Sequence, residues 1–61
     1  MEKCIKMVGN KNFILSLYET SSGTYYLVEE KNGEKAYSEG FKDFKLANFL
    51  FEAKLQELEG N

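Results

Sequence analysis

The last third of this 61-residue chain reads as one amphipathic helix with apolar residues on two sides, and it follows a strand-rich sequence. At 100° per residue, one stripe holds Phe44, Ala47, Phe51, Leu55 and Leu58. The opposite stripe holds Leu46, Phe49, Leu50 and Ala53. A domain of about 60 residues buries only about 60% of the surface that its unfolded chain exposes, so it has little material to cover both sides. We therefore expect the second stripe to form a homodimer interface, with internal cover by the first strand or a loop as the alternative.

Glycine and asparagine divide the sequence before this helix into four segments with the composition of strands. They cover about residues 3–8, 13–20, 24–31 and 35–40. Asp43 is suited to cap the start of the helix, and Gly60 is suited to end it in a left-handed conformation. The sequence predicts one α+β domain over residues 1–61, a four-stranded, mainly antiparallel β-meander with a C-terminal helix packed on one face.

Two turns set a provisional strand register. Asn32-Gly33 is typical of a two-residue type I′ turn, and Ser21-Ser22-Gly23 suits a three-residue loop with glycine in the left-handed region. The pairs that follow are Glu30 with Lys35, Val28 with Tyr37, Tyr26 with Glu39, Tyr18 with Tyr26 and Leu17 with Leu27.

The first strand has two possible registers. If Val8 pairs with Phe13, then Cys4, Lys6 and Val8 join the helix side of the sheet, while Ile5 and Met7 join the other face. A slip of one residue reverses these sets, and the edge of the sheet at which this strand lies stays open.

The register gathers Tyr18, Tyr26, Val28 and Tyr37 on the face away from the helix. Three interpretations compete for this cluster. Cross-strand aromatic pairs stabilise a sheet without any ligand. Tyrosines also suit a protein interface. They could instead stack unpaired bases, with nearby lysines following the phosphate backbone; the candidate lysines are Lys6, Lys11, Lys31 and Lys35.

The charge balance lowers the expectation of nucleic-acid binding. The net charge is −2, and the basic residues are all lysines, with no arginine. Arginine is the preferred residue for bidentate contacts with phosphate and guanine, so its absence counts against sequence-specific DNA reading.

Signatures of enzymes, metal sites and cofactor sites are scarce. The chain has no histidine, so it lacks the usual general base near neutral pH. Cys4 is more typical of a small half-buried hydrophobe than of a nucleophile. Glu29 and Glu30 are adjacent in a strand, so they point to opposite faces and cannot act on one atom; we interpret them as charges flanking a turn. The spacing of Gly9, Gly23, Gly33 and Gly40 does not fit a phosphate-binding loop, and we expect each of them to mark a turn or a helix approach. We expect a non-catalytic protein without a metal or cofactor.

Targeting and membrane signals are also missing. Charged residues interrupt the first segment, and no run approaches the roughly 20 apolar residues of a membrane span. A single cysteine allows no intramolecular disulfide. We expect a cytoplasmic protein.

Four antiparallel strands followed by one helix that dimerises resemble, in architecture only, the small single-stranded-DNA-binding transcriptional coactivator fold. The chain carries no motif of that family, and its acidic balance departs from it. The leading hypothesis is a non-catalytic binding or adaptor module, a homodimer that presents its tyrosine-bearing sheet face or a helix groove to a protein partner. The alternative that the resemblance implies is a single-stranded nucleic-acid-binding protein.

Overall fold

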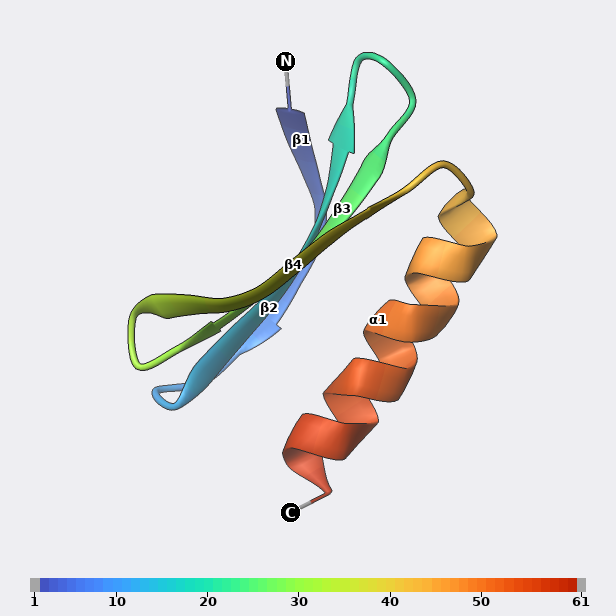
Figure 1. Cartoon of the computed structure of the whole chain (residues 1–61). Helices are drawn as coiled ribbons and strands as arrows, with labels where there is room; N and C mark the ends of the chain where they lie inside the picture. Colours follow the sequence, from blue (N-terminus) through green and yellow to red (C-terminus); the bar gives the residue numbers. More distant parts are fainter. Residues whose placement is uncertain (1, 61) are drawn as a thin grey trace.

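A computed structural model describes residues 2–60 as four strands followed by one helix (Figure 1). The elements are β1 (Glu2–Gly9), β2 (Phe13–Thr20), β3 (Tyr25–Lys31), β4 (Glu34–Phe41) and α1 (Phe44–Glu59). The strands form one sheet in the order β1-β2-β3-β4, and every neighbouring pair is antiparallel. The predicted α+β meander with one C-terminal helix is confirmed, and β1 lies at the edge beside β2.

The turn residues form the two hairpins that the sequence predicted. Asn32 and Gly33 have φ values of 54° and 83°, the left-handed pair that a type I′ turn requires. Gly23 has φ 86° and ends the loop between β2 and β3. As a result, Tyr18 lies opposite Tyr26, as predicted.

The turn between β1 and β2 is held by Asn10. Its side-chain Oδ1 accepts hydrogen bonds from the backbone N–H groups of Asn12 and Phe13, at 2.7 and 3.1 Å. This turn pairs Val8 with Leu15 rather than with Phe13. The shift is two residues, so Val8 still lies on the helix side of the sheet.

Each edge strand contains one extra residue, and these two β-bulges correct the predicted register. In β1 the pairing shifts between Cys4 and Lys6, which leaves Ile5 as the extra residue. Cys4 therefore lies opposite Tyr18, away from the helix, while Lys6 lies opposite Leu17 on the helix side. Each of the two registers that the sequence left open holds for only part of the strand.

In β4 the extra residue is Ala36, because Glu30 pairs with Lys35 while Glu29 pairs with Tyr37. The predicted Glu30–Lys35 pair is confirmed. Val28 pairs with Ser38 instead of Tyr37, and Tyr26 pairs with Gly40 instead of Glu39. A bulge turns every later side chain of its strand to the opposite face, which is why these two predicted pairs are wrong.

Asp43 caps the start of α1, as predicted. Its side chain accepts a hydrogen bond from the backbone N–H of Lys45 at 3.1 Å, which satisfies one of the free donors of the first turn. The predicted left-handed end of the helix is wrong, since Gly60 has φ −77°, and its N–H bonds to the carbonyl of Gln56.

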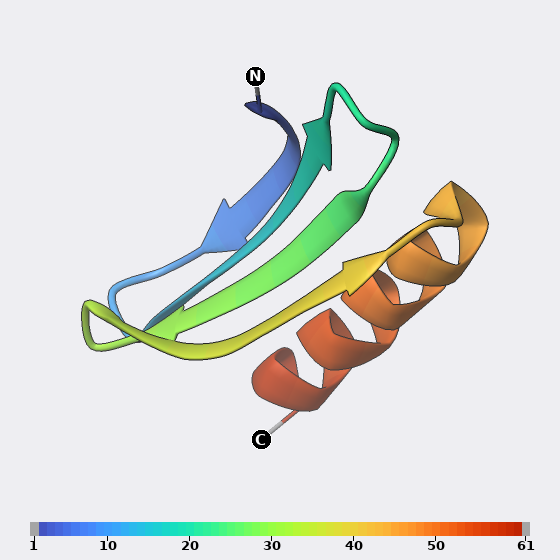
Figure 2. The same ribbon diagram turned by 45° about the horizontal axis from the view of Figure 1, so that its top comes forward.

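The core lies between α1 and one face of the sheet (Figure 2). The predicted first stripe of the helix faces it: Ala47 and Phe51 are buried, and Leu55 and Leu58 pack against them. Their buried partners are Phe13, Leu15, Leu17 and Leu27 from β2 and β3. Each large apolar side chain contributes about 1.5–3 kcal/mol on burial. The helix packs on this side, so within residues 2–60 no layer of secondary structure covers the other face of the sheet.

Candidate binding surface

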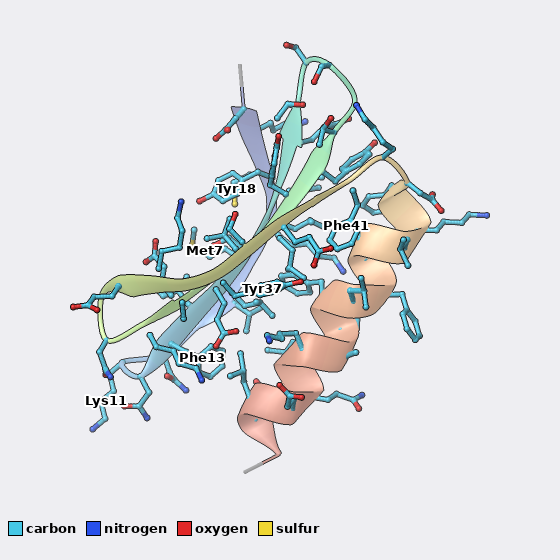
Figure 3. The ribbon with its side chains drawn as sticks, viewed as in Figure 1. Met7, Lys11, Phe13, Tyr18, Tyr37 and Phe41 are labelled. Carbon is cyan, nitrogen blue, oxygen red and sulfur yellow. The ribbon has the colours of Figure 1, made fainter. Side chains whose placement is uncertain are left out.

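The face of the sheet directed away from α1, here called the open face, is hollowed. The hollow has a volume of about 490 Å³. Figure 3 shows Tyr18 and Met7 on this side and Tyr37 and Phe41 toward the helix. The residues that line the hollow come from all four strands. They are Glu2, Tyr18, Thr20, Tyr26, Val28, Glu30, Lys35 and Ser38.

Two tyrosines from neighbouring strands form the aromatic part of the open face. Tyr18 and Tyr26 are directly opposite in the β2–β3 ladder. The Tyr26 ring lies over Gly40 of β4, where a Cβ atom would stand only 2.8 Å from the ring carbon Cε1. The expectation that this glycine marks a turn or a helix approach is therefore wrong: it makes room for an aromatic ring.

Apolar side chains continue the open face toward the β1–β2 turn. Met7 is 58% exposed, and Ile14, the neighbour of Glu30 in the ladder, is 37% exposed. Exposed apolar residues that lie together with aromatic rings are the usual composition of an interaction surface.

The polar groups of the hollow are not paired with one another. Within residues 2–60, the carboxylates of Glu2 and Glu30 and the ammonium of Lys35 form no ion pair within 4.0 Å. The hydroxyls of Tyr18 and Tyr26 likewise have no hydrogen-bond partner in the described part of the chain. These groups are solvated, and each can bond to a ligand without first breaking a contact inside the protein.

Tyr37 is not part of this surface, contrary to its predicted place in the tyrosine cluster. The bulge at Ala36 turns it to the helix side, where it packs against the core. Its hydroxyl donates a hydrogen bond to Glu39 at 2.5 Å, and the Lys54 ammonium lies 4.6 Å from the ring centroid. The hydrogen bond to Glu39, followed by desolvation, raises the pKa of Tyr37.

The four candidate lysines are dispersed, and three of them lie away from the hollow. Lys6 is on the helix side, bonded to Asn48 and 2.9 Å from the Glu52 carboxylate. Lys31 pairs with Glu29 at 3.4 Å. Lys11 is exposed in the turn after β1, so Lys35 alone lines the hollow.

A buried carboxylate on the helix side was not predicted. Glu29 is only 3% exposed, and its two oxygens lie 3.3 Å from the Lys54 ammonium and 3.4 Å from that of Lys31. The predicted divergence of Glu29 and Glu30 is confirmed, but the interpretation of both as charges flanking a turn did not predict the burial of Glu29. Glu29 lies two residues after Leu27 in the strand, so the two side chains point to the same face. This spacing was the signal that could have placed Glu29 beneath the helix.

The predicted dimer stripe is divided by the packing of α1. Leu46 is 46% exposed and Phe49 is 67% exposed, and Ala53 is also exposed. Leu50 packs in part against the core instead, because it lies nearer the buried side of the helix. We call Leu46, Phe49 and Ala53 the outer face of α1.

Three further findings concern the thiol, metal binding and membranes. Cys4 is a free thiol and is exposed, so its predicted half-burial is wrong. Among residues 2–60, no group of three or more His, Cys, Asp or Glu side chains is arranged to hold a metal ion. No helix of this described range is both long and apolar enough to cross a membrane.

Comparison of the chain with protein-family models, with curated proteins and with solved structures finds no match in any of the three.

Proposed function

We propose that this protein is a small, non-catalytic, cytoplasmic binding module that recognises a protein partner through its open sheet face. The observation that carries the proposal is the hollow of about 490 Å³, in which Tyr18 and Tyr26 lie beside polar groups without internal partners. Tyrosines supply a large contact area at low entropic cost, and they bind both apolar and polar groups. The free, exposed thiol of Cys4 suits a reducing compartment.

The charges of the hollow favour a basic segment of the partner. Two carboxylates, those of Glu2 and Glu30, stand against one ammonium, that of Lys35. Met7 and Ile14 extend the same face with exposed apolar surface. A segment with a lysine or arginine between apolar side chains would satisfy both features, because its cation can meet the carboxylates and the tyrosine rings together.

The same geometry gives the nucleic-acid alternative little support. Phosphate contacts need several cations along one surface, and the hollow contains Lys35 but neither Lys6 nor Lys31. Two acidic side chains beside the tyrosines would repel a phosphate backbone.

The test is a heteronuclear NMR titration with a capped peptide that carries one lysine between leucines. The matched peptide has glutamate in place of lysine. We expect the lysine peptide to shift the amide signals of Tyr18, Tyr26 and Glu30, and the glutamate peptide to shift them far less. Equal shifts with both peptides, or shifts confined to α1, would contradict the proposal. Binding of an oligothymidylate that weakens steeply with salt would instead favour the nucleic-acid alternative.

Two aromatic residues provide matched variants for this titration. Tyr26 on the open face is 38% exposed, and Phe44 on the helix side is 39% exposed. We expect Tyr26→Ala to weaken binding of the lysine peptide about tenfold, the effect of losing an interface anchor, while Phe44→Ala leaves it unchanged. Glu30→Gln should reduce the preference for the lysine peptide over the glutamate peptide.

A further inference from the structure

The outer face of α1 leaves a large aromatic side chain in water. Phe49 is 67% exposed and lies directly opposite the stripe that packs on the sheet. Leu46 and Ala53 lie three residues before it and four residues after it, the spacing by which a helix presents a seam to another helix. Full burial of such a phenylalanine contributes about 1.5–3 kcal/mol.

Apart from the carboxylate of Asp43 at the N-cap, the charges at the two ends of α1 oppose the dipole of the helix. A helix favours acidic residues in its first turn and basic residues in its last turn. The first turn of α1 contains no acidic residue and includes Lys45, while the last turn contains no basic residue and includes Glu57 and Glu59. In a lone helix each such charge is mildly destabilising.

A second copy of the helix running in the opposite direction would reverse this effect. The Lys45 end of one helix would then lie beside the second half of the other, where the three carboxylates of Glu52, Glu57 and Glu59 outnumber the one ammonium of Lys54. Both the side-chain charges and the helix dipoles would be complementary. A parallel pair would instead place like charges side by side at both ends.

We propose that two copies of this protein pair through the outer faces of their α1 helices, antiparallel about a twofold axis near Phe49. The two Phe49 rings meet at the centre, and Leu46 of one copy faces Ala53 of the other, a large residue against a small one. Identical surfaces that meet in this way form a closed dimer. The inference is independent of what the open sheet face binds.

The area available indicates a weak dimer. A stable interface buries about 800 Å² per partner, and a single pair of short helices offers less than that. We expect a dissociation constant on the order of micromolar or weaker, so that the dimer dissociates on dilution.

Disulfide trapping tests the orientation. In a Cys4→Ser background, Leu46→Cys and Ala53→Cys are made separately, one of them with a tag that changes its mass. The antiparallel pair predicts that the mixture forms a mixed disulfide and that neither variant efficiently cross-links with itself. Self-cross-linking of each variant without the mixed species would show a parallel pair and overturn the proposal. Both cysteine variants keep Phe49, so failure of their mixture to form any cross-linked species at high concentration would also overturn it.

Sedimentation equilibrium across a dilution series tests the contact and the charges. We expect Phe49→Glu to be monomeric with an unchanged far-UV circular dichroism spectrum, since Phe49 makes no core contact. Asn12→Glu adds the same charge in the exposed β1–β2 turn and should leave the dimer intact. Lys45→Glu should weaken the dimer about tenfold while raising the thermal stability of the monomer, because an acidic residue in the first turn favours a lone helix. A monomeric wild type at all concentrations would overturn the proposal.

Discussion

The aromatic ring of Tyr26 lies across Gly40 of the neighbouring strand, in the space that any larger residue at this position would fill. An ideal Cβ atom at position 40 would stand 2.8 Å from Cε1 and 3.2 Å from Cδ1 of the ring. A glycine in an edge strand destabilises the sheet, and an aromatic ring that packs over the glycine offsets part of this loss. The pair therefore couples the stability of β4 to the orientation of a residue on the candidate binding surface.

We expect Tyr26→Ala to lower the free energy of unfolding by at most about 1 kcal/mol, the range of a cross-strand pair. In the wild type, the ring current of Tyr26 should shift one Hα signal of Gly40 upfield, and the variant should lose that shift. Urea denaturation and a proton NMR spectrum measure the two effects.

Gly40→Ala is the reciprocal variant. The new methyl group must displace the ring, so the signals of Tyr26 should move even if the stability of the protein changes little. Unchanged Tyr26 signals would contradict the close approach of the two residues.

The buried Glu29 carboxylate should make Lys54 important for stability. Lys54→Met leaves Glu29 with Lys31 alone, and a buried charge that loses a partner is costly. We expect the free energy of unfolding, measured by urea denaturation, to fall by about 1–3 kcal/mol. This is a large share of the total stability of a domain of this size.

The double variant Glu29→Gln with Lys54→Met separates the ion pair from the packing. It should recover part of the loss, since no uncompensated charge then remains. Lys11→Met is the control on an exposed turn, and it should change the stability by less than about 0.5 kcal/mol. An effect of Lys54→Met no larger than this control would show that the buried pair contributes little.

Stability should also decline at alkaline pH through Tyr37. Its hydrogen bond to Glu39 and its desolvation raise its pKa above the ordinary value of 10.0 in the folded state. The folded protein then holds this proton more tightly than the unfolded chain. The resulting stabilisation is fully present below pH 10 and is lost as the pH rises through the folded pKa.

Urea denaturation at a series of pH values above and below 10 measures this loss. Tyr37→Phe should reduce the alkaline decline, and Glu39→Gln should lower the pKa of Tyr37 because it removes the largest cause of the shift. A decline that is identical in wild type and Tyr37→Phe would assign it to other groups.

Local signals in the sequence were sufficient for the architecture. Asn32, Gly33 and Gly23 adopt the backbone conformations that their turns require, and Asp43 caps the helix as its side chain allows. These features depend on neighbouring residues, so a single sequence contains them. The pairing of Tyr18 with Tyr26 follows from them directly.

The bulges could not be predicted in the same way. Isoleucine and alanine are not residue types that mark an extra position in a strand. Ile5 and Ala36 each become a bulge through the packing of the whole sheet. One such residue moved Tyr37 from the predicted binding surface to the helix side. The open face therefore contains two of the three predicted tyrosines, together with Val28.

The burial of Glu29 depends on a contact between distant parts of the chain. Lys54 lies on the helix, and only the docking of α1 on the sheet brings its ammonium to the carboxylate. The alternation of β3 assigns Glu29 to the same face as Leu27, but it does not show that a lysine from the helix would meet the carboxylate there.

The positions of the two bulges have a consequence for how copies of this protein can associate. A sheet with free edges tends to add strands from other molecules, which leads to fibrous aggregates. Here Ile5 and Ala36 interrupt the pairing geometry of β1 and β4, the two edge strands, so a regular ladder cannot continue across either edge. Copies of the protein can then associate through the open face of the sheet or the outer face of α1. The backbone of the edge strands opposes growth into an extended intermolecular sheet.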